Sequence, residues 1–246
     1  MTAPVEKNEA KTIMEHVGDL KKKIFIILIA FIVGAIISHL FNREITNFLL
    51  KPSNGQNLIF LSPLDPLFFI FKIDFIGGFI ISFPIILWAL FSYINPIMPQ
   101  RSKKIIGLFY FSSALLLFLG LAYAFFVTIP LSLKFLFSIS IAGISNSFSA
   151  EKYLSFFITQ ALIVMIVFQV PILVTGGIYL EFFKTKLLKD KRRYIYLILI
   201  ISLAIITPTT DIFSLLIILL PCIIIFEISL IIGKLIEKRN TTIKNN

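Results

Sequence analysis

The sequence predicts an all-α, polytopic membrane protein with six transmembrane helices in a curved bundle. Two observations lead to this fold class. Hydrophobic residues make up 58% of the 246 residues and charged residues only 15%, with a mean hydropathy of +0.96, whereas soluble domains contain about 45–50% apolar and about 25% charged residues. The charged residues also gather in short segments between long uncharged runs, as expected of a chain that crosses a bilayer several times.

Six apolar runs are candidates for membrane spans, because roughly 20 apolar residues are needed to cross about 30 Å of hydrocarbon. They cover residues 24–41, 75–94, 105–129, 154–179, 195–206 and 212–233. We therefore expect a cytoplasmic N-terminal segment 1–23, a transmembrane domain 24–234 and a cytoplasmic tail 235–246. The first segment is too long and too acidic for the start of a cleaved signal peptide. We therefore expect the first span to remain part of the mature protein.

The fifth run is short and is separated from the sixth by residues 207–211, which contain Pro208 and Asp211. Proline lacks an N–H, and the polar residues around it favour a turn, so we expect a tight hairpin between two helices. Twelve residues reach only about 18 Å. Local thinning of the bilayer and burial among neighbouring helices can each compensate for a short span, and the sequence leaves both explanations open.

The distribution of Lys and Arg predicts the orientation. The N-terminal segment, loop 95–104, loop 180–193 and the C-terminus from 234 onward carry five, three, six and four of them, eighteen in all, against five on the alternate segments. Positive loops stay cytoplasmic, so both termini are expected in the cytoplasm. On the other side, residues 57–69 are too short and too rich in proline to span, and we expect them to form a helix that lies along the interface or caps the bundle.

Several function classes are excluded by what the sequence contains. The net charge of +10 does not indicate nucleic-acid binding, because the basic residues lie between membrane-length apolar runs. The lone Cys222 can form no intramolecular disulfide, and His16 and His39 have no Cys, His or carboxylate at metal-ligand spacing. We find no nucleophile–base set, so we expect no enzyme, no cofactor and no metal.

Polar groups at membrane depth are expensive, which makes each of them a candidate for function. Glu227 lies midway through the last span and Gln169 lies deep in the fourth, next to Pro171. For both, packing against a neighbouring helix and a functional role remain open. Prolines inside the spans kink helices and leave carbonyls unpaired; they are Pro84, Pro171 and Pro221.

The segment before the first span reads His16-Val-Gly-Asp19-Leu-Lys21-Lys-Lys23. The lysines are accounted for by the positive-inside rule, but Asp19 among them is not. This segment resembles the His-Leu-x-Glu-Leu-Arg-x-Arg motif of the TatC family, the polytopic core of the twin-arginine translocase.

Further motifs resemble the same family in order and at the family's spacing, over about residues 14–236. Pro84-Ile-Ile-Leu-Trp88-Ala-Leu-Phe91-Ser-Tyr93-Ile-Asn-Pro96 is similar to Pro-x-x-x-Tyr-Gln-x-Trp-x-Phe-x-x-Pro. The others are the spacing from Gly120 to Pro130 followed by Phe135-Leu136, Phe168-Gln169-Val170-Pro171, Arg193-Tyr194, the hairpin from Thr207 to Asp211, and Pro221 with Phe226-Glu227.

The resemblance implies a receptor for signal peptides with two consecutive arginines. It implies that the chain works in a multimeric complex with single-span subunits of the TatA/TatB type, in a bacterial-type inner membrane, to export folded proteins using the proton-motive force. It also implies no covalent catalysis. In the family, the acidic residue of the first motif and a glutamate in the first cytoplasmic loop face the arginine pair. The resemblance places Asp19 in the first role, with Lys21, Lys23 and Tyr93 at neighbouring positions of the site.

The sequence departs from the family pattern at this site. Ser102 stands where the loop glutamate is expected, loop 95–104 contains no Asp or Glu, and Trp88-Ala89 replaces Tyr-Gln. A single carboxylate would then face two arginines, which fits either a divergent system with few substrates or partial decay of the site. The alternative function is a secondary transporter of a small solute or ion, which would use Glu227 and Gln169 as its midplane site.

Overall fold

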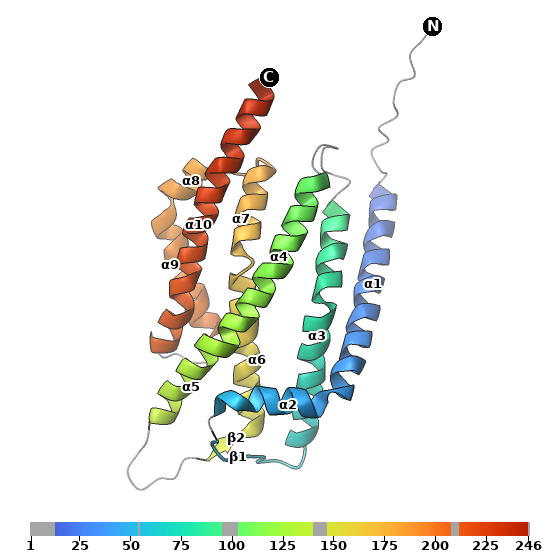
Figure 1. Ribbon diagram of the computed structural model, residues 1–246, viewed down its shortest axis with the longest axis vertical. Helices are drawn as coiled ribbons and strands as arrows, with labels where there is room; N and C mark the ends of the chain where they lie inside the picture. The colour runs from blue at the N-terminus through green and yellow to red at the C-terminus, as the bar shows by residue number, and fades with distance from the viewer. Residues whose placement is uncertain (1–12, 54, 95–102, 140–146, 208–211, 246) are drawn as a thin grey trace.

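The computed structural model describes residues 13–53, 55–94, 103–139, 147–207 and 212–245. Long helices run side by side along one direction, and a short helix lies across them at one end (Figure 1). We call the end where the first helix begins and the last helix finishes the terminal end, and the opposite end the α2 end. The α-helices in chain order are α1 (Ile13–Leu40), α2 (Asn42–Leu50), α3 (Asp65–Ile94), α4 (Lys103–Tyr123), α5 (Ile129–Ser138), α6 (Ala150–Val167), α7 (Val170–Tyr179), α8 (Thr185–Asp190), α9 (Arg192–Ile206) and α10 (Ile212–Asn245).

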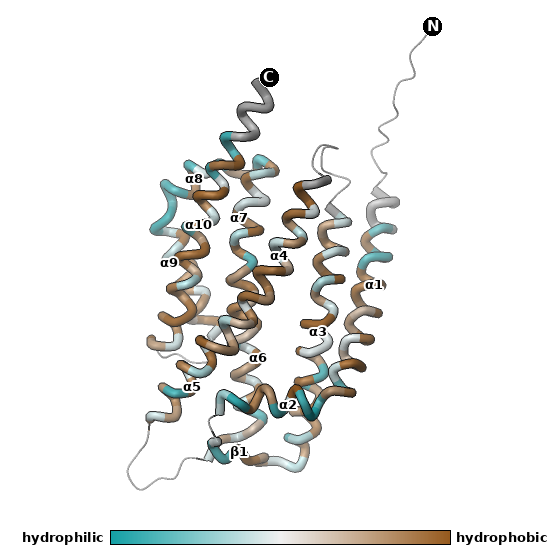
Figure 2. The backbone as a smooth tube through the Cα atoms, in the orientation of Figure 1, coloured by the Kyte–Doolittle hydropathy of each residue, from teal (hydrophilic) through white to brown (hydrophobic). Residues whose placement is uncertain are grey.

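The predicted all-α, polytopic class is confirmed. Within the described residues, five helical stretches are long and apolar enough to cross a membrane: Gly18–Leu40, Asp65–Tyr93, Ile105–Ser138, Ala150–Tyr179 and Ile212–Lys238. Large apolar side chains on these helices remain exposed, and hydrophobic residues dominate the middle of the bundle (Figure 2). The fifth predicted span corresponds to α9, whose 15 residues reach about 22 Å, so the count of six stays a prediction.

The α2 end contains most of the short elements. Helix α2 follows α1 directly, a 3-10 turn (Lys51–Ser53) follows α2, and strand β1 (Leu58–Ile59) pairs in parallel with β2 (Phe148–Ser149). The prediction of an interfacial or capping helix at 57–69 is therefore wrong. The helix that lies across the bundle is α2, and residues 65–69 already belong to α3.

Helices α1 and α3 pack closely because small residues face each other. A Cβ atom on Gly34 would lie 2.8 Å from the Gly78 carbonyl oxygen, and one on Gly78 would lie 2.9 Å from the Ala35 nitrogen. The buried Ser38 hydroxyl donates to the Ile73 carbonyl oxygen over 3.2 Å. Small residues let helix backbones approach within the membrane, where packing drives association. The contacts also set α1 and α3 antiparallel.

Pro130 sits at the join between α4 and α5. A proline ring clashes with the carbonyl four residues earlier, here that of Phe126, and the chain responds with a π-helical turn over Ala124–Thr128. The Ile129 N–H accordingly donates to the Ala124 carbonyl, five residues back. Residues 103–138 thus remain continuous helix through the proline.

Of the other prolines on the helices, Pro221 has the backbone carbonyl that it frees paired by a side chain. Pro221 lies inside α10 and leaves the Ile217 carbonyl without its helical donor; the Tyr123 hydroxyl donates to that oxygen over 3.0 Å. Pro171 stands at the start of α7, directly after the break that separates α7 from α6. Pro84 lies inside α3, and its own carbonyl accepts the Tyr110 hydroxyl over 3.2 Å.

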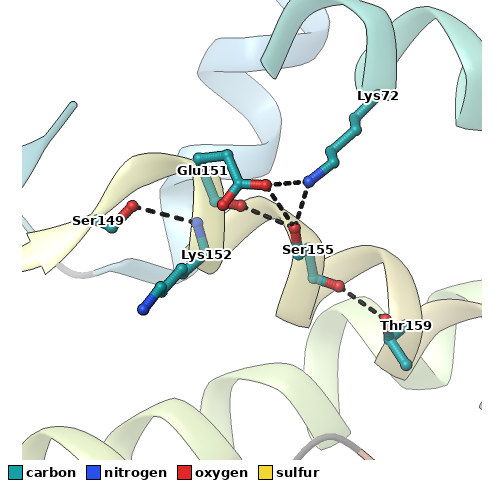
Figure 3. Close-up of polar contacts among 6 residues, drawn as sticks. All are labelled: Lys72, Ser149, Glu151, Lys152, Ser155 and Thr159. Carbon is teal, nitrogen blue, oxygen red and sulfur yellow. Dashed lines mark hydrogen bonds and ion pairs between the residues drawn. The ribbon is translucent and has the colours of Figure 1, made fainter. Parts of the chain in front are cut away.

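Helix α6 lies at the centre of the core and is joined to its neighbours at the α2 end. Tyr153 donates to the Leu49 carbonyl of α2 over 2.7 Å. Lys72 of α3 forms an ion pair with Glu151 and donates to the Ser155 hydroxyl over 2.7 Å. Figure 3 shows Lys72 directed at both residues, while the neighbouring Lys152 side chain points away. These contacts join α2 and α3 to the centre of the bundle.

Candidate functional site

The residues that the sequence singles out for peptide binding lie at the terminal end, on α1 and α3. Asp19, Lys21 and Lys23 lie on α1, and Tyr93 lies near the last residue of α3. Asp19 and Lys23 are four residues apart on one helix, which places them on the same face. We call Asp19, Lys21, Lys23, Trp88, Ser92 and Tyr93 the recognition surface.

Lys23 is the residue that connects the two helices of this surface. Its Nζ atom donates to the Ser92 hydroxyl over 2.7 Å and lies 4.3 Å from the centroid of the Trp88 ring. Trp88 and Ser92 are one helical turn apart on α3, so one cation can reach both. A cation within about 6 Å of an indole face is attracted by the negative potential of the ring. The lysine is thus held by α3.

The other predicted residues of the surface differ in exposure. Lys21 is exposed, whereas Asp19 and Tyr93 are half-buried. Ser102, predicted as a further binding residue, and Pro96 lie outside the described residues, as do Pro208 and Asp211 of the hairpin. The sequence places no acidic residue between 95 and 104, so the carboxylate that the family motif assigns to this surface is that of Asp19.

Gln169 lies at the break between α6 and α7 and is paired with Ser113 of α4. The Ser113 hydroxyl donates to Gln169 Oε1 over 2.5 Å, and Gln169 Nε2 donates back to the Ser113 carbonyl over 3.3 Å. Ser113 is buried. The amide therefore uses a donor and an acceptor within the bundle, as a polar group at membrane depth requires.

Glu227 pairs with two residues of α9. Its Oε2 atom lies 2.9 Å from Nη2 of Arg192, and its Oε1 atom accepts a hydrogen bond from the Tyr196 hydroxyl. Tyr196 also contacts Phe226 edge to face, with ring centroids 5.9 Å apart. Glu227 on the last predicted span is thus paired with the helix of the short fifth predicted span.

Sequence reasoning gave no role to several residues that the structure brings into these contacts. Arg192 lies in a predicted cytoplasmic loop, and Ser113 and Tyr196 are polar residues within apolar runs. Trp88 and Ser92 enter the sequence argument only as part of a motif. A helical wheel shows that Trp88 and Ser92 share a face. Their pairing with Lys23 depends on the antiparallel register of α1 and α3, which the sequence does not contain.

Fold and site together define a multi-pass, all-α membrane protein with a charged and aromatic surface where its first helix passes its second span. The family model described as Sec-independent protein translocase protein (TatC) matches residues 15–221. The chain belongs to the TatC family. It is accordingly a core subunit of the twin-arginine translocase, and the alternative of a small-solute transporter is set aside.

Relatives match along almost the whole chain. The Aquifex aeolicus Sec-independent protein translocase protein TatC is 30% identical over 236 residues, covering 94% of this chain and 98% of that protein. The Carboxydothermus hydrogenoformans TatC is 28% identical over 95% of this chain and 97% of that protein. A crystal structure of the twin-arginine translocase receptor TatC superposes with a TM-score of 0.77 at 30% identity, covering 90% of this chain and 99% of the other. A second such structure, in DDM, gives 0.79 at 29%, over 89% and 99%.

Proposed function

We propose that this chain is the signal-peptide receptor of its translocase and that it binds twin-arginine signal peptides at the recognition surface. Bound cargo then passes, folded, across a bacterial-type inner membrane with the help of single-span subunits of the TatA/TatB type and the proton-motive force. Both termini face the cytoplasm, which the Lys and Arg distribution supports. The observation that carries the proposal is the position of Asp19, half-buried at the terminal end on the same helical face as the anchored Lys23.

The chemistry suits an arginine ligand. A carboxylate grips a guanidinium through charge-assisted, often bidentate hydrogen bonds. Lys21, Lys22 and Lys23 follow Asp19 closely in the sequence, and Arg101, Lys103 and Lys104 lie in or directly after the loop that the motif places nearby. Two incoming arginines would be repelled by this charge without a carboxylate, although salt weakens the repulsion at an exposed surface.

Replacement of the carboxylate tests this function. Asp19→Ala and Asp19→Asn should abolish crosslinking of a twin-arginine signal peptide, while membrane insertion stays normal. Glu44→Ala, which removes an exposed carboxylate at the α2 end, is the matched control and should crosslink as the parent does. Crosslinking by Asp19→Ala at the parent level would place recognition on another surface or on a partner subunit.

The missing loop carboxylate offers a gain-of-function test. Ser102→Glu should restore two acidic groups for two arginines and tighten peptide binding. Ser102→Gln has a similar size and no charge, and should leave binding unchanged. Both the loss at Asp19 and the gain at Ser102 should shrink as ionic strength rises, because both depend on charge.

We propose a packing role for Gln169 and Glu227, since each has its polar atoms engaged by a neighbouring helix. In this role they support partner assembly indirectly, by holding α4, α9 and α10 in place.

A further inference from the structure

We propose that the Trp88 ring is a cation seat within the recognition surface, occupied by Lys23 when no peptide is bound and taken over by one of the two arginines of a signal peptide. This inference rests on the proposed receptor function and deepens it. It assigns a second contact for the arginine pair, in addition to Asp19, and a residue that distinguishes arginine from lysine.

The seat is already formed. Lys23 Nζ lies 4.3 Å from the centroid of the Trp88 ring, and the Ser92 hydroxyl accepts its hydrogen bond one helical turn further along α3. Trp88 is 47% exposed, so the described helices leave part of the ring uncovered. A tryptophan near the end of a span also serves as an interface anchor, but an anchor needs no cation on its face.

Arginine is the better occupant of such a seat. Its guanidinium is planar, delocalised and weakly hydrated, and it stacks on aromatic faces, whereas the lysine ammonium is compact and strongly hydrated. Lys23 has a long, flexible stem that lets its charged group return to water when displaced. The Ser92 hydroxyl can then accept a hydrogen bond from the guanidinium in its place.

The spacing of Asp19 and Lys23 fits two consecutive arginines. These residues are one helical turn apart, or about 6 Å along α1. Consecutive peptide residues have Cα atoms about 3.8 Å apart, and the length of the arginine side chain covers the difference. One arginine can thus pair with the Asp19 carboxylate while its neighbour stacks on Trp88, which takes the place of the second carboxylate that loop 95–104 lacks.

Trp88 is the only tryptophan in the chain, so its fluorescence reports on the seat directly. The full chain, reconstituted with its partner subunits made without tryptophan, is titrated with a tryptophan-free signal peptide carrying Arg-Arg and with the same peptide carrying Lys-Lys. We expect a saturable change in emission with the first and a weaker one with the second. Lys23→Met empties the seat, so it should alter the emission of the free protein and tighten binding of the Arg-Arg peptide several-fold.

Binding affinities of ring variants, measured by peptide crosslinking, complete the test. Trp88→Leu should weaken the Arg-Arg peptide about two- to fivefold, as expected for an exposed cation–π contact, and reduce the preference for Arg-Arg over Lys-Lys. Trp88→Tyr should restore most of the affinity for the Arg-Arg peptide and most of the preference over Lys-Lys. Phe111→Leu, which removes an exposed ring from α4, should behave as the parent.

The outcomes separate this inference from the receptor function. If the parent crosslinks the Arg-Arg peptide while Trp88 emission stays flat and Trp88→Leu keeps the parent affinity and preference, the seat is overturned and the receptor function stands. If Trp88→Leu fails to insert, Lys23→Met decides, because unchanged peptide affinity in that variant also overturns the seat. If no peptide crosslinks to the parent in the complete complex, the receptor function fails.

Discussion

Arg192 and Glu227 form an ion pair between the shortest predicted span and the last one, with Nη2 of the arginine 2.9 Å from Oε2 of the glutamate. Tyr196 adds a hydrogen bond to the same carboxylate. Helix α9 also buries Leu203 in the hydrophobic core, so these polar contacts add to apolar packing in holding α9 on α10. The Glu227 side chain is 32% exposed and that of Arg192 42%, which weakens the pair relative to a fully buried one.

The first prediction concerns this pair. Glu227→Leu and Arg192→Leu should each destabilise the detergent-solubilised protein, and the double variant should be more stable than the sum of the two losses implies. Polar contacts between membrane helices are worth about 0.5–2 kcal/mol, and a double-mutant cycle in SDS unfolding measures that coupling. Glu227→Gln keeps the acceptor for Tyr196 and should export a reporter normally. A stable but inactive Glu227→Gln would instead assign the carboxylate a direct function.

The second prediction concerns Gln169 and Ser113. Ser113→Ala leaves the Gln169 amide oxygen at membrane depth without its donor, and an unsatisfied buried polar group costs about 1–3 kcal/mol. The double variant Ser113→Ala with Gln169→Leu should recover much of that loss, because neither polar group remains. Thermal unfolding in detergent measures it. Ser112→Ala is the control on the same helix and should change little. Equal stability of Ser113→Ala and the parent would show that the contact contributes nothing.

The positions of five of the six predicted spans agree with the structure, because run length and hydropathy decide them, but some helix ends could not be predicted. Helix α3 begins at Asp65, whereas the predicted span begins at 75, because Lys72 and Asp74 interrupt the apolar run. These charges are tolerated in the helix because Glu151 neutralises Lys72, and His39 and Asn42 bind Asp74. Their partners are distant in the sequence, so local composition gave no sign of them.

The candidate site was predictable to a similar extent. The motif around Asp19 identified the terminal end of α1, and the next motif identified the end of α3. The contact of Lys23 with Trp88 depends on how closely α1 and α3 approach each other. Gly34, Gly77 and Gly78 allow this close approach. Neither motif on its own specifies the distance between the two helices.

The third prediction concerns this close packing. Gly78→Val places a side chain against the backbone of Ala35, where even a Cβ atom would lie 2.9 Å from the nitrogen, and backbone cannot move aside cheaply. Overpacking of this kind costs about 1–3 kcal/mol, and α1 should separate from α3. Gly107→Val is the matched control on α4, because a Cβ atom there would meet nothing within 4 Å. A disulfide-crosslinking scan between α1 and α3 should lose efficiency in the first variant only.

The fourth prediction concerns orientation. Reporter fusions after Asn246, within 95–104 and within 180–193 should read cytoplasmic, and fusions within 130–153 should read external, because the Lys and Arg counts differ so strongly between the two sides. Fusions on the two sides serve as controls for each other. A C-terminal fusion that reads external would reject the six-span arrangement and leave α9 as a helix that does not cross the membrane.

The last prediction concerns the ion pair of Lys72 and Glu151, which joins α3 to α6 near the α2 end (Figure 3). Lys72→Glu should destabilise the bundle, because it places two carboxylates together at a half-buried site between helices. The exchange variant Lys72→Glu with Glu151→Lys should regain stability, since the opposite charges again face each other. Thermal unfolding of the parent, both single variants and the exchange variant measures the effect. Lys152→Glu is the matched control: it reverses the charge next to Glu151 on a side chain that points away from Lys72, and it should change stability far less. If the exchange variant is no more stable than the two single variants, the electrostatic contact does not hold α3 on α6. Apolar packing between these helices then suffices.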